Sequence, residues 1–187
     1  GCSDGKLETL NTITVRLEDQ NEPPTMPDLT RDVDENTLAL TAVGAPATGV
    51  DVDAGQTEDL AYFIIGGNTG DAFFIDRDSG QIQVRTDGVL DHEAKAVYKL
   101  QVQAVDNGAG ALRDTGIVTV NVVDVNDPPT FPAATGRSIN ENSAPGTAAG
   151  LPVVGHDEDA GDAITYAITG GSGREFFTVD TDGTLRA

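Results

Sequence analysis

Two copies of one oxygen-rich motif occur in this chain of 187 residues. The first reads Asp-Gln-Asn-Glu-Pro-Pro-Thr over 19–25, and the second reads Asp-Val-Asn-Asp-Pro-Pro-Thr over 124–130, which is 105 residues later. Each copy places carboxylates and an Asn amide beside a Pro-Pro pair that cannot continue a β-strand. Because such oxygen donors are the ligands that hard cations prefer, the motif predicts calcium bound at a stiff hinge between two small domains.

Other segments recur at nearly the same interval, which is the signature of an internal repeat. Asp34-Glu35-Asn36-Thr37 matches Asn140-Glu141-Asn142-Ser143, and Asp51-Val52-Asp53-Ala54-Gly55 matches Asp157-Glu158-Asp159-Ala160-Gly161. The end of the repeat also recurs, because Ile13-Thr14-Val15-Arg16-Leu17 corresponds to Val118-Thr119-Val120-Asn121-Val122.

The repeat divides the chain into three parts. We expect the C-terminal strand and linker of a preceding repeat over 1–22, a complete repeat over 23–127 and the N-terminal part of a following repeat over 128–187.

The hydropathy pattern is that of β-strands. Apolar and polar residues alternate over 13–17, 98–104 and, less cleanly, 117–122, so each strand should have one buried and one exposed face in an antiparallel arrangement. Glycine-rich turns recur throughout, and no segment has sustained helical periodicity. We therefore predict an all-β, tandem Greek-key β-sandwich of the immunoglobulin-like kind, with about seven strands per complete repeat. Its aromatic core should consist of Tyr62, Phe73, Phe74 and Tyr98.

The composition excludes several partners. The chain carries 31 acidic and 11 basic residues, for a net charge of −20, so we expect neither nucleic-acid binding nor direct contact with an anionic membrane. A solvated acidic surface would explain scattered charges, but many of these acids stand in short clusters that repel one another unless a cation neutralises them. A turn-forming role, which suits Asp and Asn, is the plain alternative.

The clustered acids fall where a sandwich would bring them to one end of the complete repeat. Three groups should meet there, after the first strand, before the Tyr98 strand and after the last strand, and the start of the next repeat should face them. These groups are Glu35; Asp91 and Glu93; Asp124, Asn126 and Asp127; and, from the next repeat, Asp157 and Asp159.

The ordered set of motifs resembles the tandem extracellular repeats of cadherins. The resemblance rests on the Glu-Asn pair at 35–36, the Leu-Asp-His-Glu box at 90–93, Ala104-Val105-Asp106-Asn107-Gly108, the Asp-x-Asp triplets and the linker that ends in Pro-Pro. It implies a cadherin-type fold, with two to three Ca²⁺ ions at each complete junction. At the junction near 127 the ligands would be the Val125 carbonyl and the side chains of Glu35, Asp91, Glu93, Asp124, Asn126, Asp127, Asp157 and Asp159. At the junction near 22 they would be Asp19, Asn21 and Glu22, facing Asp51, Asp53 and Asp106.

The chain departs from the family pattern at three positions. Pro128 stands where the family linker has a second Asn, and Glu22 replaces the linker Asp in the first copy. His92 occupies a position where Arg is common, and we expect it to be a surface residue. We expect the junction near 127 to be the fuller of the two sites.

The resemblance implies an extracellular, calcium-binding module of a large, membrane-anchored cell-surface protein. Its role would be adhesion or spacing, with neighbouring repeats and a homophilic or heterophilic protein as partners. A cadherin-like module that binds polysaccharide is the alternative, but it would need an exposed aromatic platform, and Trp is absent. An enzyme is not expected, because the acids face a junction and the only histidines are His92 and His156. Exposed strand edges in the flanking parts would pair between molecules.

Overall fold

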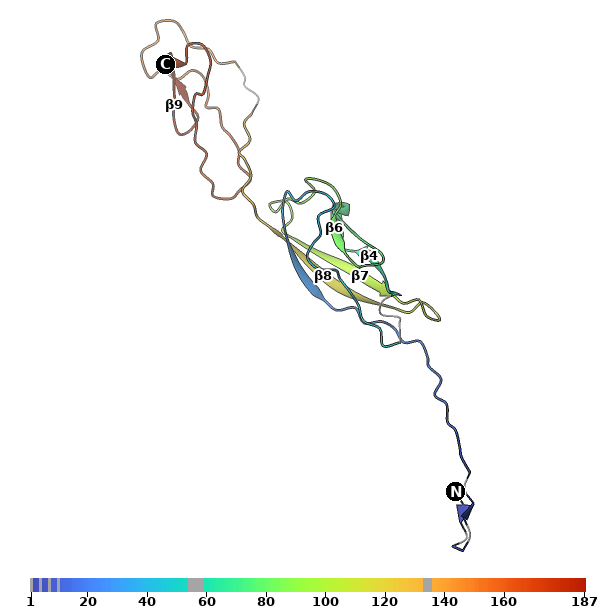
Figure 1. The fold of residues 1–187 in the computed structure, drawn as a ribbon. Helices are drawn as coiled ribbons and strands as arrows, with labels where there is room; N and C mark the ends of the chain where they lie inside the picture. The colour runs from blue at the N-terminus through green and yellow to red at the C-terminus, as the bar shows by residue number, and fades with distance from the viewer. Residues whose placement is uncertain (1, 4, 7, 10, 54–58, 133–135) are drawn as a thin grey trace.

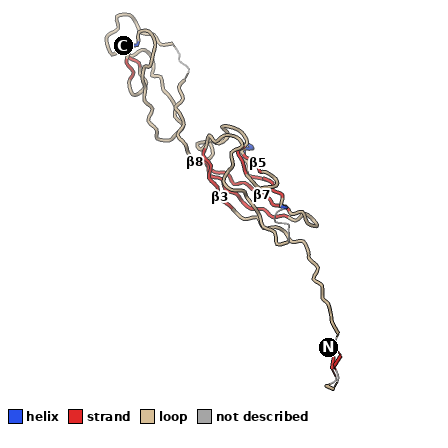
Figure 2. The backbone as a smooth tube through the Cα atoms, in the orientation of Figure 1, coloured by secondary structure: helices blue, strands red, loops and turns tan. Residues whose placement is uncertain are grey.

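The computed structural model describes residues 2–3, 5–6, 8–9, 11–53, 59–132 and 136–187. These residues form an elongated molecule with a compact β-body in the middle, and the two termini lie at its opposite ends (Figure 1). Most residues in β-strands lie in the central body, whereas the two end regions consist mainly of loops (Figure 2).

The main sheet of the central body has four strands in the order β3-β8-β7-β4. These are β3 (Leu29–Asp34), β4 (Ala61–Gly66), β7 (Val97–Val105) and β8 (Arg113–Val123). The longest pairing joins β7 and β8 in antiparallel register, with Leu100 opposite Val118 and Val102 opposite Gly116. The β3 strand runs parallel to β8, so the expectation of purely antiparallel strands is wrong at this edge.

A second, smaller layer consists of β5 (Phe73–Ile75) and β6 (Ile82–Val84), which pair antiparallel. The segment 40–43 lies along β6 through backbone hydrogen bonds, and one bridge joins Thr25 to Val50. The described part of the body therefore has six strands, whereas the sequence predicted about seven per repeat. The difference arises because these flanking segments form single bridges and no continuous ladder.

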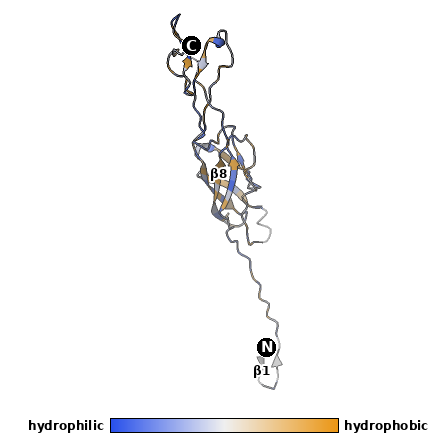
Figure 3. Ribbon diagram, turned by 90° about the vertical axis from the view of Figure 1, so that its left-hand side faces the viewer, coloured by the Kyte–Doolittle hydropathy of each residue, from blue (hydrophilic) through white to orange (hydrophobic). Residues whose placement is uncertain are grey.

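The core lies between the two layers, and Figure 3 shows hydrophobic residues concentrated on the strands of the central body. Along β7 and β8 every second residue is buried, and Leu100, Val102, Val118 and Val120 are fully enclosed, which confirms the predicted alternation. The Phe73 and Tyr98 rings pack edge to face with centroids 5.1 Å apart. Three of the four predicted aromatic anchors, Tyr62, Phe73 and Tyr98, are buried. Phe74 is half-buried beneath the Arg85 guanidinium.

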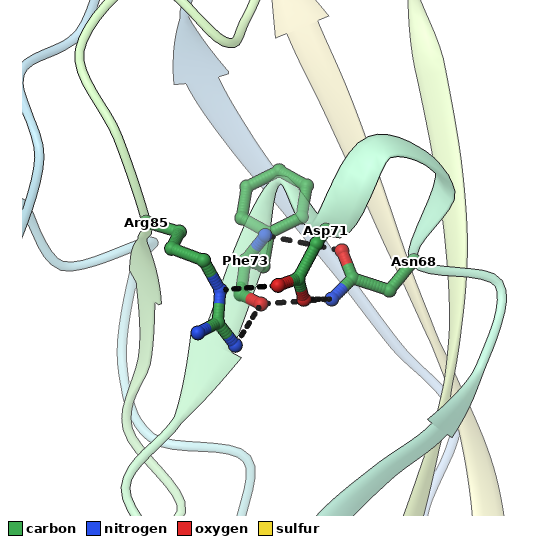
Figure 4. Close-up of polar contacts among 4 residues, drawn as sticks. All are labelled: Asn68, Asp71, Phe73 and Arg85. Atoms are coloured by element: carbon green, nitrogen blue, oxygen red, sulfur yellow. Dashed lines mark hydrogen bonds and ion pairs between the residues drawn. The ribbon is translucent and has the colours of Figure 1, made fainter.

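A polar clamp fixes the turn between the two layers (Figure 4). The Asn68 side chain accepts a hydrogen bond from the Phe73 N–H (3.0 Å) and donates one to the Phe73 carbonyl (2.8 Å). Arg85 forms a salt bridge with Asp71 (3.1 Å). Together these contacts hold the single-turn helix η2 (Thr69–Asp71) between β4 and β5.

The described residues of the two end regions form only short strands. One hairpin pairs β1 (Cys2–Ser3) with β2 (Glu8–Thr9), and another pairs β9 (Thr178–Val179) with β10 (Leu185–Arg186). The alternating segment 13–17 is extended, but no strand in the described part of the chain lies beside it. The prediction of a packed strand there is therefore wrong, because a β-strand needs a hydrogen-bonded neighbour.

The described residues from Thr130 onward reproduce several hydrogen bonds of the central body about 105 residues later. The Tyr62 hydroxyl accepts a hydrogen bond from Gly49 N–H (3.1 Å), and the Tyr166 hydroxyl accepts one from Gly155 N–H (2.9 Å). The bridge between Thr25 and Val50 recurs between Thr130 and His156. The internal repeat of the sequence is thus also a repeat of structure.

The described residues contain one further single-turn helix, η3 (Arg174–Phe176). Neither η2 nor η3 approaches the length or apolar character of a membrane-crossing helix.

Candidate calcium junctions

The end of the central body near residue 127 is organised around Glu35, which is only 2 % exposed although it carries a carboxylate. Its two oxygens accept hydrogen bonds from the backbone N–H groups of His92 and Val125, both at 2.8 Å. Glu35 follows β3 directly, His92 lies in the loop before β7, and Val125 follows β8. One buried carboxylate therefore joins the three predicted groups of acids.

Further carboxylates gather beside Glu35. Ligand atoms of Glu35, Asp91 and Glu93 lie within 4.8 Å of one another, and so do those of His92, Glu93 and Asp124. Asp91 is fixed by a hydrogen bond from Ala94 N–H (2.6 Å), which shapes the loop that presents Glu93. Four of the predicted acids, Glu35, Asp91, Glu93 and Asp124, thus lie together at one end of the body.

The crowding changes the titration of Glu93. A hydrogen bond from its own backbone N–H lowers the pKa of Glu93, but loss of hydration beside its neighbours and the charges of Glu35 and Asp124 outweigh it, so the pKa is raised. Like charges at this distance cost free energy, and a divalent cation would relieve that cost. The donor set therefore suits Ca²⁺, which takes carboxylate and carbonyl oxygens.

His92 is half-buried, and the prediction of a plain surface residue is wrong. Its Nδ1 lies 2.7 Å from the Val122 carbonyl oxygen, and this contact, followed by the charges of Asp124, Glu93 and Glu35, raises the pKa of His92. The ring therefore packs the loop before β7 against the end of β8.

The linker contacts both sides of the junction. The Asp127 N–H donates a hydrogen bond to the Asp159 carboxylate (2.6 Å), and Asp127 Oδ1 accepts one from the Asn36 amide (2.8 Å). On the far side, ligand atoms of Asp157, Asp159 and Asp162 lie within 4.8 Å of one another. Asp157 also accepts a hydrogen bond from Asp159 N–H (3.1 Å), so the loop is shaped by its own carboxylates.

The junction near 22 has the same design. The Glu22 N–H donates a hydrogen bond to the Asp53 carboxylate (2.9 Å), as Asp127 does to Asp159. The Asn21 amide donates one to Asp106 (2.9 Å), and Asp53 N–H donates one to Asp51 (2.9 Å).

The three acids that the body contributes to this junction are buried, with 5–6 % exposure, namely Asp51, Asp53 and Asp106. Glu22 has a raised pKa, first because of its side-chain hydrogen bond with Asp53, then because of lost hydration and the charges of Asp53, Asp19 and Asp51.

Not every predicted ligand is oriented toward its cluster. The Asn126 amide donates a hydrogen bond to the neighbouring Asp127 carbonyl (3.0 Å), and Asp19 affects the site through its charge on Glu22. The sequence argument also missed Asn36 and Asp162 as members of the junction. The sequence does contain a signal for both residues, since Asn36 follows Glu35 directly and Asp162 lies three positions after Asp159 in the same loop.

Comparisons with known proteins show the family and the fold of the chain. The Cadherin domain family matches residues 30–123. Protocadherin-16 of Rattus norvegicus is 34 % identical over 186 residues, which cover 96 % of this chain and 6 % of that protein. The chain belongs to the cadherin family. Protein dachsous of Drosophila melanogaster is 34 % identical over 166 residues, which cover 87 % of this cadherin chain and 5 % of dachsous. The chain therefore spans only a small part of these relatives.

The solved structure of mouse cadherin-23 EC22–24 superimposes with a TM-score of 0.62 and 30 % identity, covering 88 % of this chain and 53 % of that one. The all-β sandwich is thus a cadherin fold, and the chain is an extracellular module of the cell surface. Cadherin domains are adhesion modules and not enzymes, and calcium binding is expected of the family. The polysaccharide alternative gains no support, because Tyr62 and Tyr98 lie in the core and offer no platform.

Proposed function

We propose that this cadherin chain is a calcium-stiffened segment of a long extracellular rod, in which Ca²⁺ at two junctions fixes the angle between successive repeats. The parts 1–22, 23–127 and 128–187 would belong to three consecutive repeats. The observation that carries the proposal is that Glu93 lies close to Glu35 on one side and to Asp124 on the other, at one end of the body. At the same end, the Asp127 N–H donates a hydrogen bond to Asp159 of the following unit.

Two groups of residues would hold the ions, two to three per complete junction. Near 127 they are Glu35, Asp91, Glu93, Asp124, the Val125 carbonyl, Asn126, Asp127, Asp157 and Asp159, and near 22 they are Asp19, Asn21, Glu22, Asp51, Asp53 and Asp106. Bound Ca²⁺ would supply the positive charge that these oxygens need in order to stay close together.

The protein contributes the positions of the oxygens. Glu35 orients the loop before β7 and the linker through its two accepted hydrogen bonds, so both reach the junction in a fixed arrangement. Pro128 and Pro129 restrict the backbone between the two units, because each proline ring fixes its φ angle. A rod of this kind would serve adhesion or spacing, with a homophilic or heterophilic protein partner.

A calcium titration by calorimetry, paired with thermal melts, tests the proposal on the whole chain. If the sites bind only the folded state, calcium at a hundredfold excess over its Kd stabilises that state by about 2.7 kcal/mol. This corresponds to a rise in Tm of roughly 10 °C or more for a domain of about 100 residues. Glu93→Gln and Asp124→Asn should each weaken binding about tenfold or more and remove much of the rise in Tm.

Asp78→Asn is the matched control, because it removes one exposed carboxylate, in the turn between β5 and β6, that belongs to neither group of proposed ligands. It should leave the titration unchanged. Equal losses in all three variants, or melts that coincide with and without calcium, would overturn the proposed site.

A further inference from the structure

His92 stands inside the group of acids at the end of the body near residue 127. One ring nitrogen of His92 and one carboxylate oxygen each of Glu93 and Asp124 lie within 4.8 Å of one another. Calcium takes oxygen ligands, so the proposed calcium junction does not explain a nitrogen in this group. A neutral imidazole beside two carboxylates is instead a donor set that suits Zn²⁺.

The ring of His92 is oriented so that one nitrogen can hold a metal. Its Nδ1 lies 2.7 Å from the Val122 carbonyl oxygen. A carbonyl oxygen only accepts hydrogen bonds, so Nδ1 carries the hydrogen and the neutral ring keeps its lone pair on Nε2. Metal-bound histidines have the same arrangement, in which the second ring nitrogen donates to a carbonyl oxygen and thereby fixes the tautomer.

The backbone around His92 is held independently of its ring. The His92 N–H donates to Glu35 Oε2 (2.8 Å), and the other oxygen of Glu35 accepts from the Val125 N–H (2.8 Å). Glu35 therefore ties the loop that carries His92 and Glu93 to the segment after β8 that carries Asp124. The three candidate ligands come from two distant segments of the chain, and a buried side chain outside the group positions both segments.

The carboxylates can complete a zinc shell by moving their side chains. Tetrahedral zinc, with ligands at about 2.0–2.2 Å, places its ligand atoms roughly 3.4 Å apart. Glu93 and Asp124 are exposed, so both can rotate toward Nε2 without disturbing the core. Three protein ligands leave the fourth position of the shell to water.

We infer that His92, Glu93 and Asp124 bind Zn²⁺, with Nε2 of His92 as the ligand that calcium does not use. Glu93 and Asp124 are also proposed calcium ligands, so the two ions compete for this end of the body. The zinc site does not depend on calcium, and only the competition rests on the proposed function. Zinc keeps these two carboxylates within one unit, so it loosens a junction that calcium stiffens.

Zinc titrations by calorimetry test the site on the whole chain, in calcium-free buffer and in a Cys2→Ser background that removes a competing thiol. His92→Gln should weaken zinc binding by more than about tenfold, because it removes the nitrogen ligand. His156→Gln is the matched control, since it removes the other, exposed histidine, which joins no group of candidate ligands among the described residues. It should leave the titration unchanged. Equal weakening in both variants, or none in His92→Gln, would overturn the inference.

NMR of the chain labelled with ¹⁵N-histidine identifies the ligand atom without relying on a substitution in the titrated protein. The chain has two histidines, and the spectrum of His92→Gln assigns their ring signals. Zinc should shift the Nε2 signal of His92, leave its Nδ1 protonated and leave both signals of His156 in place. An unmoved Nε2 signal, or coordination through Nδ1, would contradict the site.

Calcium titrations with and without zinc separate this inference from the proposed function. Saturating zinc should weaken calcium binding to the Cys2→Ser chain but not to its His92→Gln variant, and Glu93→Gln should weaken the binding of both ions. If zinc shifts Nε2 of His92 and calcium does not bind, the zinc site stands and the proposed function fails. If calcium binds and zinc leaves Nε2 of His92 unmoved, the zinc site alone fails. Zinc binding through Nε2 without any change in calcium affinity would refute the competition.

Discussion

At the scale of single residues, Glu35 has two roles. As a ligand candidate it follows from the sequence, because it stands in the repeated Glu-Asn pair. Its structural role does not follow, since its hydrogen bonds reach His92 and Val125, which are 57 and 90 residues away. A sequence motif shows which residue offers an oxygen ligand. The hydrogen-bond partners of that residue depend on how distant loops pack around it. The half-buried state of His92 was missed for the same reason.

The structural role of Glu35 can be measured without calcium. Glu35→Gln replaces one accepting oxygen with an NH₂ group that faces a backbone N–H, so a buried donor loses its partner. We expect the free energy of unfolding to fall by about 1–3 kcal/mol in metal-free urea titrations. Glu141→Gln, at the exposed equivalent position, should change it by no more than about 0.5 kcal/mol. Equal effects of the two variants would show that Glu35 only carries charge.

At the scale of strands, alternation predicted β7 and β8 well, because both have one face on the core and one in solvent. The same alternation over 13–17 predicted a packed strand that the structure does not have. Alternation indicates which face is apolar, but it does not say whether a neighbour is present. Alternation also does not show whether two neighbouring strands run parallel or antiparallel, so it could not predict the parallel pairing of β3 with β8.

The position of β8 depends on a close approach at Gly116. A Cβ atom there would lie 2.5 Å from the Pro27 carbonyl oxygen and 2.8 Å from that of Met26, so residue 116 must be small. We expect Gly116→Ala to lower the free energy of unfolding by about 1–3 kcal/mol, because backbone must shift to admit the methyl group. Urea unfolding followed by circular dichroism measures this loss. Gly170→Ala, where a Cβ atom meets nothing within 4 Å, should not lower stability. An unchanged Gly116→Ala variant would contradict the packing described for β8.

At the scale of the whole molecule, the repeat was readable from the sequence because its motifs recur at a fixed interval. The structure adds that the hydrogen bonds of the junctions recur too, since Glu22 N–H contacts Asp53 as Asp127 N–H contacts Asp159. Each junction brings like charges together across a short linker. The angle between units should therefore depend on what neutralises those charges, which is the central claim of the proposed function.

The most direct test measures a distance across the junction near 127. Spin labels on Thr86→Cys and Ser172→Cys, both exposed and in different units, are placed in a Cys2→Ser background and measured by pulsed electron resonance. With calcium we predict one narrow distance distribution, and with chelator a broad one. Glu93→Gln should leave the distribution broad in both conditions. A distribution that is the same with and without calcium would contradict the claim that calcium stiffens the junction.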